Sequence, residues 1–361
     1  MTVMDGGSPC GAIRACFVPH IPLGLIYGGS EVQAERTLLQ LNENGHRAFW
    51  LDCSDHSLLE HVDVFHFFGA DVEFAYTIHT LYHSCPIVVS SVFSEASWLR
   101  RVAWRYGRHV PVTIPRKVWR LLMQATLILP NSEAEARQLH ELFGVEENRM
   151  RVVPNGVDTD FVGTDPVAFR RRYLPEWPLD APFVLCVGRI EKRKNPLLLA
   201  QACQAAGVRL VLVGQLAPNT DLAYQRRLLE LVAAHSDRLK YLGQLPRREL
   251  PDAYAAAAVH ALVSTMETPG LASLEAGLNG CNLVVGQHPT VHEYFDGIAT
   301  IVHQDVSSVR AGVERALAMP RNGQGQAEAI ARQYTWDRVA RLTAEAYREA
   351  IDLYNKGNGA A

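Results

Sequence analysis

The sequence predicts an α/β protein built from two Rossmann-like domains. Short apolar runs alternate with segments of helical periodicity along the chain, which is typical of a parallel sheet covered by helices. A strand–loop–helix–strand unit begins at residue 13, and a second strand followed by a turn and a helix begins at residue 183. With 361 residues, the chain is long enough for two domains of ordinary size.

The first domain is expected to begin with a buried strand over 13–18. A glycine-containing loop leads from it into a helix over 31–44, and Gly45 then acts as a stop signal. Ser132 is predicted to cap a later helix, with Glu135 as its partner in a capping box. The other strands of this domain are expected at 48–51, 64–68, 87–91, 127–129 and 150–153.

Residues 159–181 carry several prolines and mixed charge, and we interpret them as the linker between the domains. A final amphipathic helix is expected to follow residue 337 and to run to about Tyr354. The strands of the second domain are expected at 183–187, 209–213, 240–245, 258–263, 282–285 and 300–302, and its helices at 196–206, 222–233 and 273–278.

The composition excludes several classes of protein. A net charge of −3 gives no bulk indication of nucleic-acid binding. No apolar run approaches the roughly 20 residues of a membrane span, and the N-terminus lacks the pattern of a secretory signal. The seven cysteines are scattered, which favours a reducing cytoplasm. Four of them lie in or beside apolar runs and are expected to be buried: Cys16, Cys186, Cys203 and Cys281.

The stretch 266–277 carries the first candidate site. It follows the apolar run 258–263 and contains Pro269 and Gly270 just before a predicted helix. The start of a helix offers free N–H groups to an anion such as a diphosphate. Glu267 and Glu275 flank that start, and carboxylates are suited to accept hydrogen bonds from ribose or sugar hydroxyls. The alternative is a solvated helix with an ordinary glutamate.

Two further turns are candidate phosphate sites. After the strand 183–187, the turn 188–196 carries four basic residues and leads into a helix, which suits a diphosphate. The first strand of the chain leads to Gly28-Gly29-Ser30-Glu31, which is not the Gly-x-Gly-x-x-Gly of a standard NAD site. The alternatives are a solvated basic turn and a glycine loop without a ligand.

The spacing Glu-x7-Glu followed by Ala-Gly resembles the signature of the retaining glycosyltransferases of family 4. These enzymes have the GT-B architecture, in which two Rossmann-like domains face each other across a cleft and a C-terminal helix crosses back to the N-terminal domain. The resemblance covers nearly the whole chain, from about residue 12 to 355. It implies an acceptor-side domain over 1–165, completed by about 338–361, and a donor-binding domain over 166–337.

The resemblance also assigns roles to single residues. In the family, an Arg and a Lys five residues later hold the donor diphosphate, and Arg189 and Lys194 have that spacing. Glu267 would hold the hydroxyls of the donor sugar and Glu275 those of the ribose. Neither a metal nor a cofactor is then required. The other implied donor-binding residues come from the glycine turns and from a loop beside the nucleobase: Gly28, Gly29, Gln244, Leu245, Pro269, Gly270, Leu271 and Ala272.

The implied function is transfer of a sugar from a nucleotide-sugar donor to a glycan, lipid-linked or small-molecule acceptor, with retention of configuration. A place in surface polysaccharide or glycolipid biosynthesis is expected from the resemblance, and UDP, GDP and ADP sugars all remain open. Two other hypotheses stand beside it: a catalytically silent protein that binds sugar nucleotides or acts as a scaffold, and a nucleotide-sugar epimerase of the same architecture.

The chain departs from the family at one position. Members usually carry a His after the fourth strand of the first domain, near the 6-hydroxyl of the donor sugar. In this chain, Val92 or Phe93 occupies the position of that His. This fits a 6-deoxyhexose donor, which would replace a polar contact by an apolar one. His20, His66 and Glu95 are candidates for polar contacts to the sugar, although a lone His near a strand end is more often structural.

The stretch 98–120 is basic and aromatic, and no Asp or Glu occurs from Ala96 through Ser132. Such a stretch can lie against an anionic membrane or receive a lipid-diphosphate acceptor, which would place the protein peripherally at the inner face of the membrane. Single-stranded nucleic acid is a further option, but no RNA-binding motif supports it. The alternative is a solvated basic face on two helices separated by Pro111 and Pro115.

Overall fold

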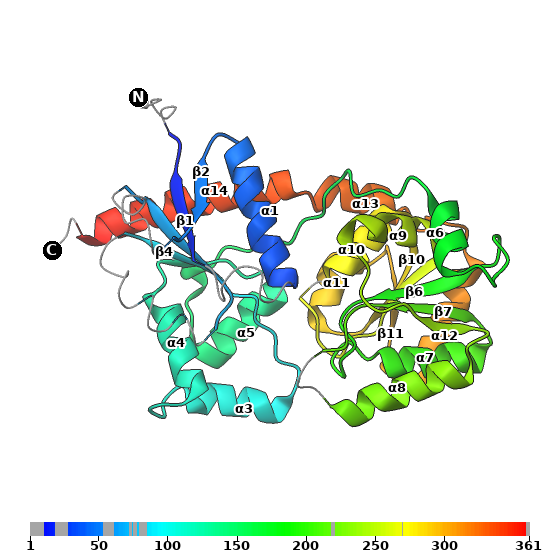
Figure 1. Cartoon of the computed structure of the whole chain (residues 1–361). Coiled ribbons are helices and arrows are strands. Elements are labelled where there is room, and N and C mark those ends of the chain that lie inside the picture. The colour runs from blue at the N-terminus through cyan, green and yellow to red at the C-terminus, as the bar shows by residue number, and fades with distance from the viewer. Residues whose placement is uncertain are drawn as a thin grey trace. The chain divides into compact units, whose positions relative to one another are not determined.

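The computed structural model describes residues 11–18, 28–52, 61–71, 74, 78, 85–217, 221–268 and 270–358 (Figure 1). The chain divides into two compact units. Unit 1 comprises Met1–Gly156 and Trp336–Ala361, and unit 2 comprises Val157–Thr335. Both units contain a parallel sheet with helices packed against it, which confirms the predicted fold class.

Unit 1 is built on a five-stranded sheet with the order β2-β1-β3-β4-β5. All neighbouring strands are parallel, and β1 pairs with both β2 and β3. The chain thus reverses its direction of strand addition between β1 and β3, and the loop after β1 leads to Gly28. The strands are β1 Arg14–Val18, β2 Arg47–Trp50, β3 Val64–Phe68, β4 Ile87–Ser90 and β5 Leu127–Ile128.

The predicted strand at 150–153 is wrong. Met150 forms only an isolated bridge with Ile128, beside β5. The Arg151 N–H donates to the Ile128 carbonyl at 3.0 Å and the Val153 N–H donates to the Pro130 carbonyl at 2.9 Å. Pro130 has no N–H to donate in return, so a full ladder does not form. The predicted cap at Ser132 is present, since its side chain accepts a hydrogen bond from the Glu135 N–H. The helices of unit 1 are α1 Gly29–Glu43, α3 Trp98–Gly107, α4 Ile114–Gln124, α5 Glu133–Phe143 and α14 Trp336–Asn358.

The last helix, α14, returns to unit 1, as the resemblance implied, and packs against α1 (Figure 1). Its Tyr347 hydroxyl lies 2.6 Å from Nδ1 of His66 on β3, and the other ring nitrogen lies 2.9 Å from the Ser90 hydroxyl. Burial lowers the pKa of His66 to about 3, so the ring is neutral. His66 therefore joins two strands to the C-terminal helix.

Unit 2 is built on a six-stranded parallel sheet with the order β11-β10-β9-β6-β7-β8. The strand predicted over 240–245 ends at Tyr241, and Gly243 follows it in a left-handed conformation (φ +71°). The strands are β6 Phe183–Val187, β7 Arg209–Val213, β8 Leu239–Tyr241, β9 Val259–Leu262, β10 Asn282–Gly286 and β11 Thr300–Val302. The helices are α6 Pro166–Tyr173, α7 Pro196–Ala206, α8 Leu222–Ala234, α9 Leu250–Ala256, α10 Leu271–Leu278, α11 Pro289–Phe295, α12 Val306–Ala318 and α13 Gln326–Gln333.

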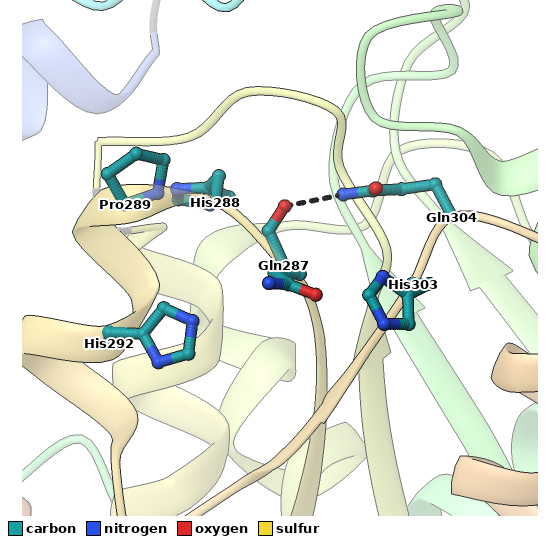
Figure 2. Close-up of a pocket in the computed structure, with 6 residues that line it drawn as sticks. All are labelled: Gln287, His288, Pro289, His292, His303 and Gln304. Atoms are coloured by element: carbon teal, nitrogen blue, oxygen red, sulfur yellow. Dashed lines mark hydrogen bonds between the residues drawn. The ribbon is translucent and has the colours of Figure 1, made fainter.

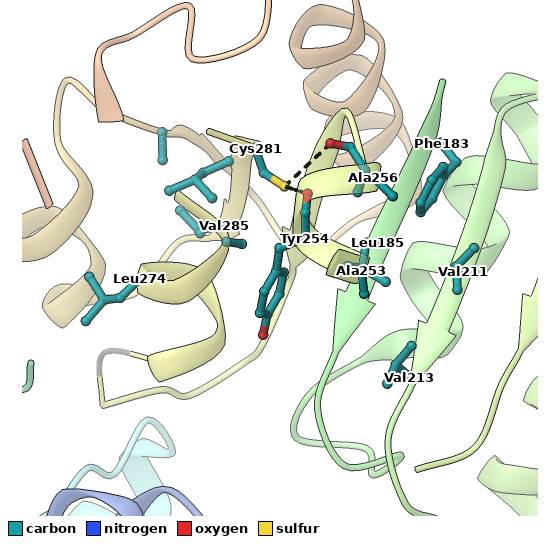
Figure 3. Close-up of a cluster of buried hydrophobic side chains, with 14 of the residues drawn as sticks. Phe183, Leu185, Val211, Val213, Ala253, Tyr254, Ala256, Leu274, Cys281 and Val285 are labelled. Carbon is teal, nitrogen blue, oxygen red and sulfur yellow. Dashed lines mark hydrogen bonds between the residues drawn. The ribbon is translucent and has the colours of Figure 1, made fainter. Parts of the chain in front are cut away.

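One face of this sheet forms a hydrophobic core with α9 and α10 (Figure 3). Phe183 and Val211 contribute from the strands, and Tyr254 and Leu274 contribute from the helices. Cys281 belongs to the same core, and burial raises the pKa of its thiol to about 12. The three other cysteines predicted to be buried are also buried: Cys16, Cys186 and Cys203.

The predicted linker over 159–181 is wrong, because the segment belongs to the core of unit 2. Within it, Asp165 caps α6 and Pro166 occupies the first helical turn, where a proline costs no hydrogen bond. Phe169 and Trp177 are buried in the same core as Phe183 and Tyr254, and the Trp177 indole N–H donates to the Asp237 carbonyl at 2.9 Å. Of the three prolines that suggested a linker, Pro166 starts a helix instead.

Replacing Phe169 by alanine should therefore destabilise the protein. Truncating a buried Phe costs about 3–5 kcal/mol, and thermal unfolding followed by circular dichroism should show a lower midpoint. Val167 lies on the same helix but is exposed, so Val167→Ala should change the stability by less than about 0.5 kcal/mol. Equal, small effects of both substitutions would support a linker.

Candidate functional site

The candidate site lies at the carboxyl ends of β6 and β9. These strands are neighbours in the sheet, but the chain proceeds from β6 to β7 and β8 on one side before it adds β9 on the other. In open α/β sheets, ligands bind at such a reversal, because the loops from the two strands diverge there and leave a crevice. The predicted basic turn follows β6, and the predicted glutamates follow β9.

The basic turn is ordered by one internal carboxylate. Glu191 receives hydrogen bonds from the Arg193 guanidinium, at 3.0 and 3.2 Å, and lies 3.7 Å from Arg189. Arg189 keeps 48% of its side chain exposed, so it remains accessible to a ligand. The Thr265 N–H donates to the Arg193 carbonyl at 2.9 Å and thereby fastens the turn to the loop after β9. Asn195, in the left-handed conformation, then starts α7.

Lys194 forms an ion pair with Glu267 across this junction. Both side chains are nearly buried, and the Ser264 hydroxyl donates to the same Glu267 oxygen at 3.1 Å. Burial by itself raises the pKa of Glu267, but the Lys194 charge and hydrogen bond outweigh it and hold the pKa below its ordinary value. The structure thus brings together two residues that lie far apart in the sequence and keeps Glu267 ionised.

The turn before α10 requires a glycine. Gly270 has φ +77°, and a Cβ there would lie 3.1 Å from Cγ of Glu267. The helix starts at Leu271, two residues earlier than predicted, so the first unpaired N–H groups belong to Leu271 and Ala272. Both residues are half-buried. Pro269 lies outside the described residues.

Glu275 is buried at the second turn of α10 and is held by two partners. Its carboxylate lies 2.9 Å from a guanidinium nitrogen of Arg247 and accepts a hydrogen bond of 3.0 Å from the Tyr254 hydroxyl. Burial raises the pKa of Glu275, although Arg247 and Tyr254 both act to lower it. The Arg247 guanidinium also stacks on the Phe161 ring, with 4.5 Å to the centroid.

The other predicted donor-binding residues have different surroundings. Gln244 is exposed in the loop after β8, whereas Leu245 is buried in the same core as Phe183 and Tyr254, so its side chain packs inside the unit. Gly28 and Gly29 lie in unit 1, where the Gly28 N–H donates to the Glu31 carboxylate at 2.9 Å and α1 begins.

In unit 1, the residues at and near the position of the expected family histidine make contacts within the unit. Phe93 is buried and packs edge-on against Trp104 and Phe143, while Val92 has an unusual positive φ of 43°. Glu95 accepts from the Ser97 N–H at 3.0 Å, and His66 is engaged by α14. His20 lies outside the described residues.

The sequence did not indicate the partners of the two glutamates. Arg247 and Tyr254 precede Glu275 by 28 and 21 residues, and no motif connects them to it. Only Ser264 could have been suspected, since it precedes Glu267 by three residues on the same loop.

A pocket that the sequence analysis missed lies at the carboxyl ends of β10 and β11 (Figure 2). It has a volume of about 380 Å³, and the Gln304 amide bridges the carbonyls of Gln287 and Ser264, at 2.9 and 3.2 Å. Burial lowers the pKa of His288 to about 4, and the Glu267 carboxylate opposes this shift. The lining residues are Gln287, His288, Pro289, His292, His303 and Gln304.

Among the described residues, no group of three or more His, Cys, Asp or Glu side chains is arranged to hold a metal ion. Within the same part of the chain, no helix has the length and apolar character needed to cross a membrane.

Two family models match the chain. The model of the group 1 glycosyl transferases matches residues 172–333, and the model of glycosyltransferase family 4 matches residues 56–161. The two matched segments together span most of the chain and include Arg189, Lys194, Arg247, Glu267 and Glu275.

Curated relatives are D-inositol 3-phosphate glycosyltransferases. The protein of Xylanimonas cellulosilytica is 30% identical over 244 residues, which are 62% of this chain and 57% of the relative. The protein of Geodermatophilus obscurus is 31% identical over 248 residues, which are 64% of this chain and 54% of the relative. The chain thus spans little more than half the length of these relatives.

Solved structures share the fold over almost the whole chain. A glycosyltransferase from Rickettsia africae has a TM-score of 0.73 at 12% identity, with 94% of this chain and 99% of that chain covered. Anabaena Alr3699/HepE in complex with UDP-glucose has a TM-score of 0.72 at 16% identity, with 93% and 100% covered. At these identities the likeness concerns the fold alone.

Replacing Lys194 by methionine should destabilise unit 2, because it leaves the nearly buried Glu267 carboxylate without its cation. Removing one partner of a buried ion pair costs about 3–5 kcal/mol, and chemical denaturation should show this loss. The double variant Lys194→Met/Glu267→Gln should recover most of it. If the double variant were as unstable as Lys194→Met, the result would contradict an ion pair between Lys194 and Glu267.

The Lys194–Glu267 ion pair also predicts how the stability of the protein changes with pH. Because the folded pKa of Glu267 lies below the ordinary value of 4.5, its contribution to stability is present above pH 4.5 and is lost as the pH falls through the lowered pKa. Denaturation curves at decreasing pH should show this loss in the wild type and a smaller one in Glu267→Gln.

Proposed function

Because the chain belongs to the glycosyltransferases of group 1 and family 4, we propose that it transfers a sugar from a nucleotide-sugar donor to an acceptor with retention of configuration. One observation carries this proposal: the Lys194–Glu267 pair joins the loops of β6 and β9 at the reversal of the sheet. It places a cation and a carboxylate beside a helix start, where a diphosphate and a sugar would lie next to each other.

The cations of the site would stabilise the leaving group. As the bond between the sugar and the diphosphate breaks, negative charge grows on the diphosphate. Arg189 is accessible, and the Lys194 ammonium has three N–H donors, so it can serve a phosphate while it keeps its bond to Glu267. The N–H groups of Leu271 and Ala272 would add to this stabilisation. No metal is required in this arrangement.

The two glutamates would bind the neutral parts of the donor. An ionised Glu267 accepts hydrogen bonds from sugar hydroxyls, and Glu275 accepts them from the ribose. In front-face attack, the acceptor oxygen bonds to the anomeric carbon on the side that the diphosphate leaves, and the acceptor proton passes to a phosphate oxygen. Protein residues then need not act as nucleophiles, and the configuration is retained.

The relatives support a nucleoside diphosphate donor. Anabaena Alr3699/HepE is solved with UDP-glucose, and Arabidopsis starch synthase IV with ADP and acarbose. The curated relatives are named for D-inositol 3-phosphate, which is a phosphorylated polyol. We propose a hydroxyl-rich acceptor, either a glycan, a lipid-linked glycan or a small polyol, in the assembly of surface polysaccharides or glycolipids.

A thermal-shift screen with UDP, GDP and ADP, each with and without EDTA, tests the donor site. A ligand at about 100 times its Kd stabilises the folded state by about 2.7 kcal/mol, so one nucleotide should raise the melting temperature even with EDTA present. Arg189→Ala and Lys194→Ala should lose the shift. Lys192→Ala should keep it, because Lys192 is an exposed cation of the same turn. A shift from none of the nucleotides, or its loss in Lys192→Ala alone, would refute the site.

Turnover distinguishes the proposal from its rivals. With a matching donor and acceptor, Arg189→Ala should lower kcat about 100- to 1,000-fold, as for the loss of one transition-state donor. Nuclear magnetic resonance should show a product anomer of the same configuration as the donor. An isomerised donor without acceptor would indicate an epimerase, and nucleotide binding without turnover would indicate a silent binding protein.

Arg247→Ala should change the pH dependence of nucleotide binding. Arg247 lowers the pKa of Glu275 against the effect of burial, so its removal should raise that pKa further. The ionised carboxylate binds the ribose, and affinity falls as the pH drops through the Glu275 pKa. Isothermal titration across pH should show this fall at a higher pH in Arg247→Ala. The exposed neighbour Arg248→Ala should follow the wild-type profile, and identical profiles for all three proteins would contradict the role of Arg247.

A further inference from the structure

Helix α3 lies on unit 1 without burying any of its ten residues (Figure 1). Trp98 is 70% exposed, Leu99 62% and Tyr106 65%. The exposure continues through the connection to α4, where Val112 is 86% exposed. Half of the exposed large hydrophobic side chains among the described residues fall between 98 and 114: Trp98, Leu99, Val102, Tyr106, Val110, Val112 and Ile114. We call these residues the α3–α4 surface.

The orientation of α3 is fixed by a separate set of residues. Arg101 forms an ion pair with Glu141, Trp104 packs on Phe143, and Arg108 donates to the Leu142 carbonyl at 3.2 Å. These contacts hold one side of the helix against α5.

The apolar side of α3 points the opposite way. Leu99, Val102 and Tyr106 each precede one of the three anchoring residues by two positions. At about 100° per residue, this places them roughly 200° around the helix from the anchors. An ordinary surface helix buries its apolar stripe, whereas α3 exposes Leu99, Val102 and Tyr106.

Positive charge borders this apolar side. Arg100 and Arg105 are exposed and lie between the apolar residues and the anchored side. No acidic residue occurs from Ala96 through Ser132, so α3 and α4 themselves offer these arginines no carboxylate. Arg116 stacks over Trp119 at 4.3 Å, and Lys117 and Arg120 add further charge on α4.

We propose that the α3–α4 surface docks the protein on an anionic lipid bilayer. Trp98, Leu99 and Tyr106 would enter the boundary between headgroups and acyl chains, while Arg100 and Arg105 would contact lipid phosphates. Charge complementarity selects this occupant: exposed aliphatic side chains gain nothing from a nucleic acid, and an apolar protein partner would leave the arginines unpaired. The inference is independent of the proposed glycosyl transfer.

Co-sedimentation of the full chain with phosphatidylcholine vesicles, with and without phosphatidylglycerol, tests this inference. The wild type should bind only the anionic vesicles, and binding should weaken with added salt. Each arginine near such a surface strengthens binding about five-fold, so Arg100→Gln/Arg105→Gln should weaken it about 25-fold. Leu99→Ser should weaken it about ten-fold or more, through lost apolar burial.

Helix α8 of unit 2 provides matched controls. Leu222, Arg226 and Arg227 are exposed in the same way, so Leu222→Ser and Arg226→Gln/Arg227→Gln should bind as the wild type does. Circular dichroism should show that all variants fold. The inference would be overturned if the wild type did not bind anionic vesicles, or if the α3 and α8 variants lost binding equally. It would also be overturned if the α3 substitutions abolished a protein dimer or a heparin complex but left vesicle binding intact.

Discussion

The ion pair between Lys194 and Glu267 is the contact on which the rest of the site depends. It joins two loops that leave neighbouring strands in diverging directions, and it lies next to the start of α10. Two nearly buried charges are tolerated in such a place only while each neutralises the other. The pair therefore fixes the distance between the turn proposed to bind phosphate and the carboxylate proposed to bind the sugar before any ligand arrives. Preorganised charge of this kind needs no rearrangement when charge develops on a leaving group.

The pKa values of Glu267 and Glu275, the two glutamates on either side of the α10 start, are shifted in opposite directions. Burial raises the pKa of both, but for Glu267 the ammonium of Lys194 prevails, whereas for Glu275 burial prevails over Arg247 and Tyr254. The more strongly ionised carboxylate thus belongs to the proposed sugar side, close to the His288 pocket. The ribose side keeps a carboxylate whose charge depends on a guanidinium. Because Arg247 already contacts the Glu275 carboxylate, a ribose bound there, as proposed, would share or displace that contact.

Local sequence patterns predicted most of the fold, since strand periodicity, helix caps and glycine stops are properties of short segments. The cap at Ser132 and the helix start after Asn195 are examples. The errors arose where contacts between distant residues decide the structure. The segment 159–181 was interpreted as a linker, but Phe169 and Trp177 are buried in the core of unit 2. The segment 150–153 was predicted as a strand, but Pro130 has no N–H to complete the ladder beside β5. For the site, the spacing of Arg189, Lys194, Glu267 and Glu275 was legible in the sequence. The pairing of Lys194 with Glu267, 73 residues away, and of Arg247 with Glu275 depends on how strands are ordered in the sheet, which no local pattern encodes.

The hydrogen bond between Tyr347 and His66 links residues 281 positions apart and closes unit 1 with the last helix of the chain. Unit 2 is continuous in sequence, whereas unit 1 is interrupted by it. During synthesis, all of unit 2 therefore leaves the ribosome before α14 does, and the first unit waits for its final helix. Until then, the ring of His66 and the face of the sheet that α14 covers stay open to water. Unit 1 is thus completed after unit 2, and removal of α14 would expose apolar sheet surface to the cell's chaperones and proteases.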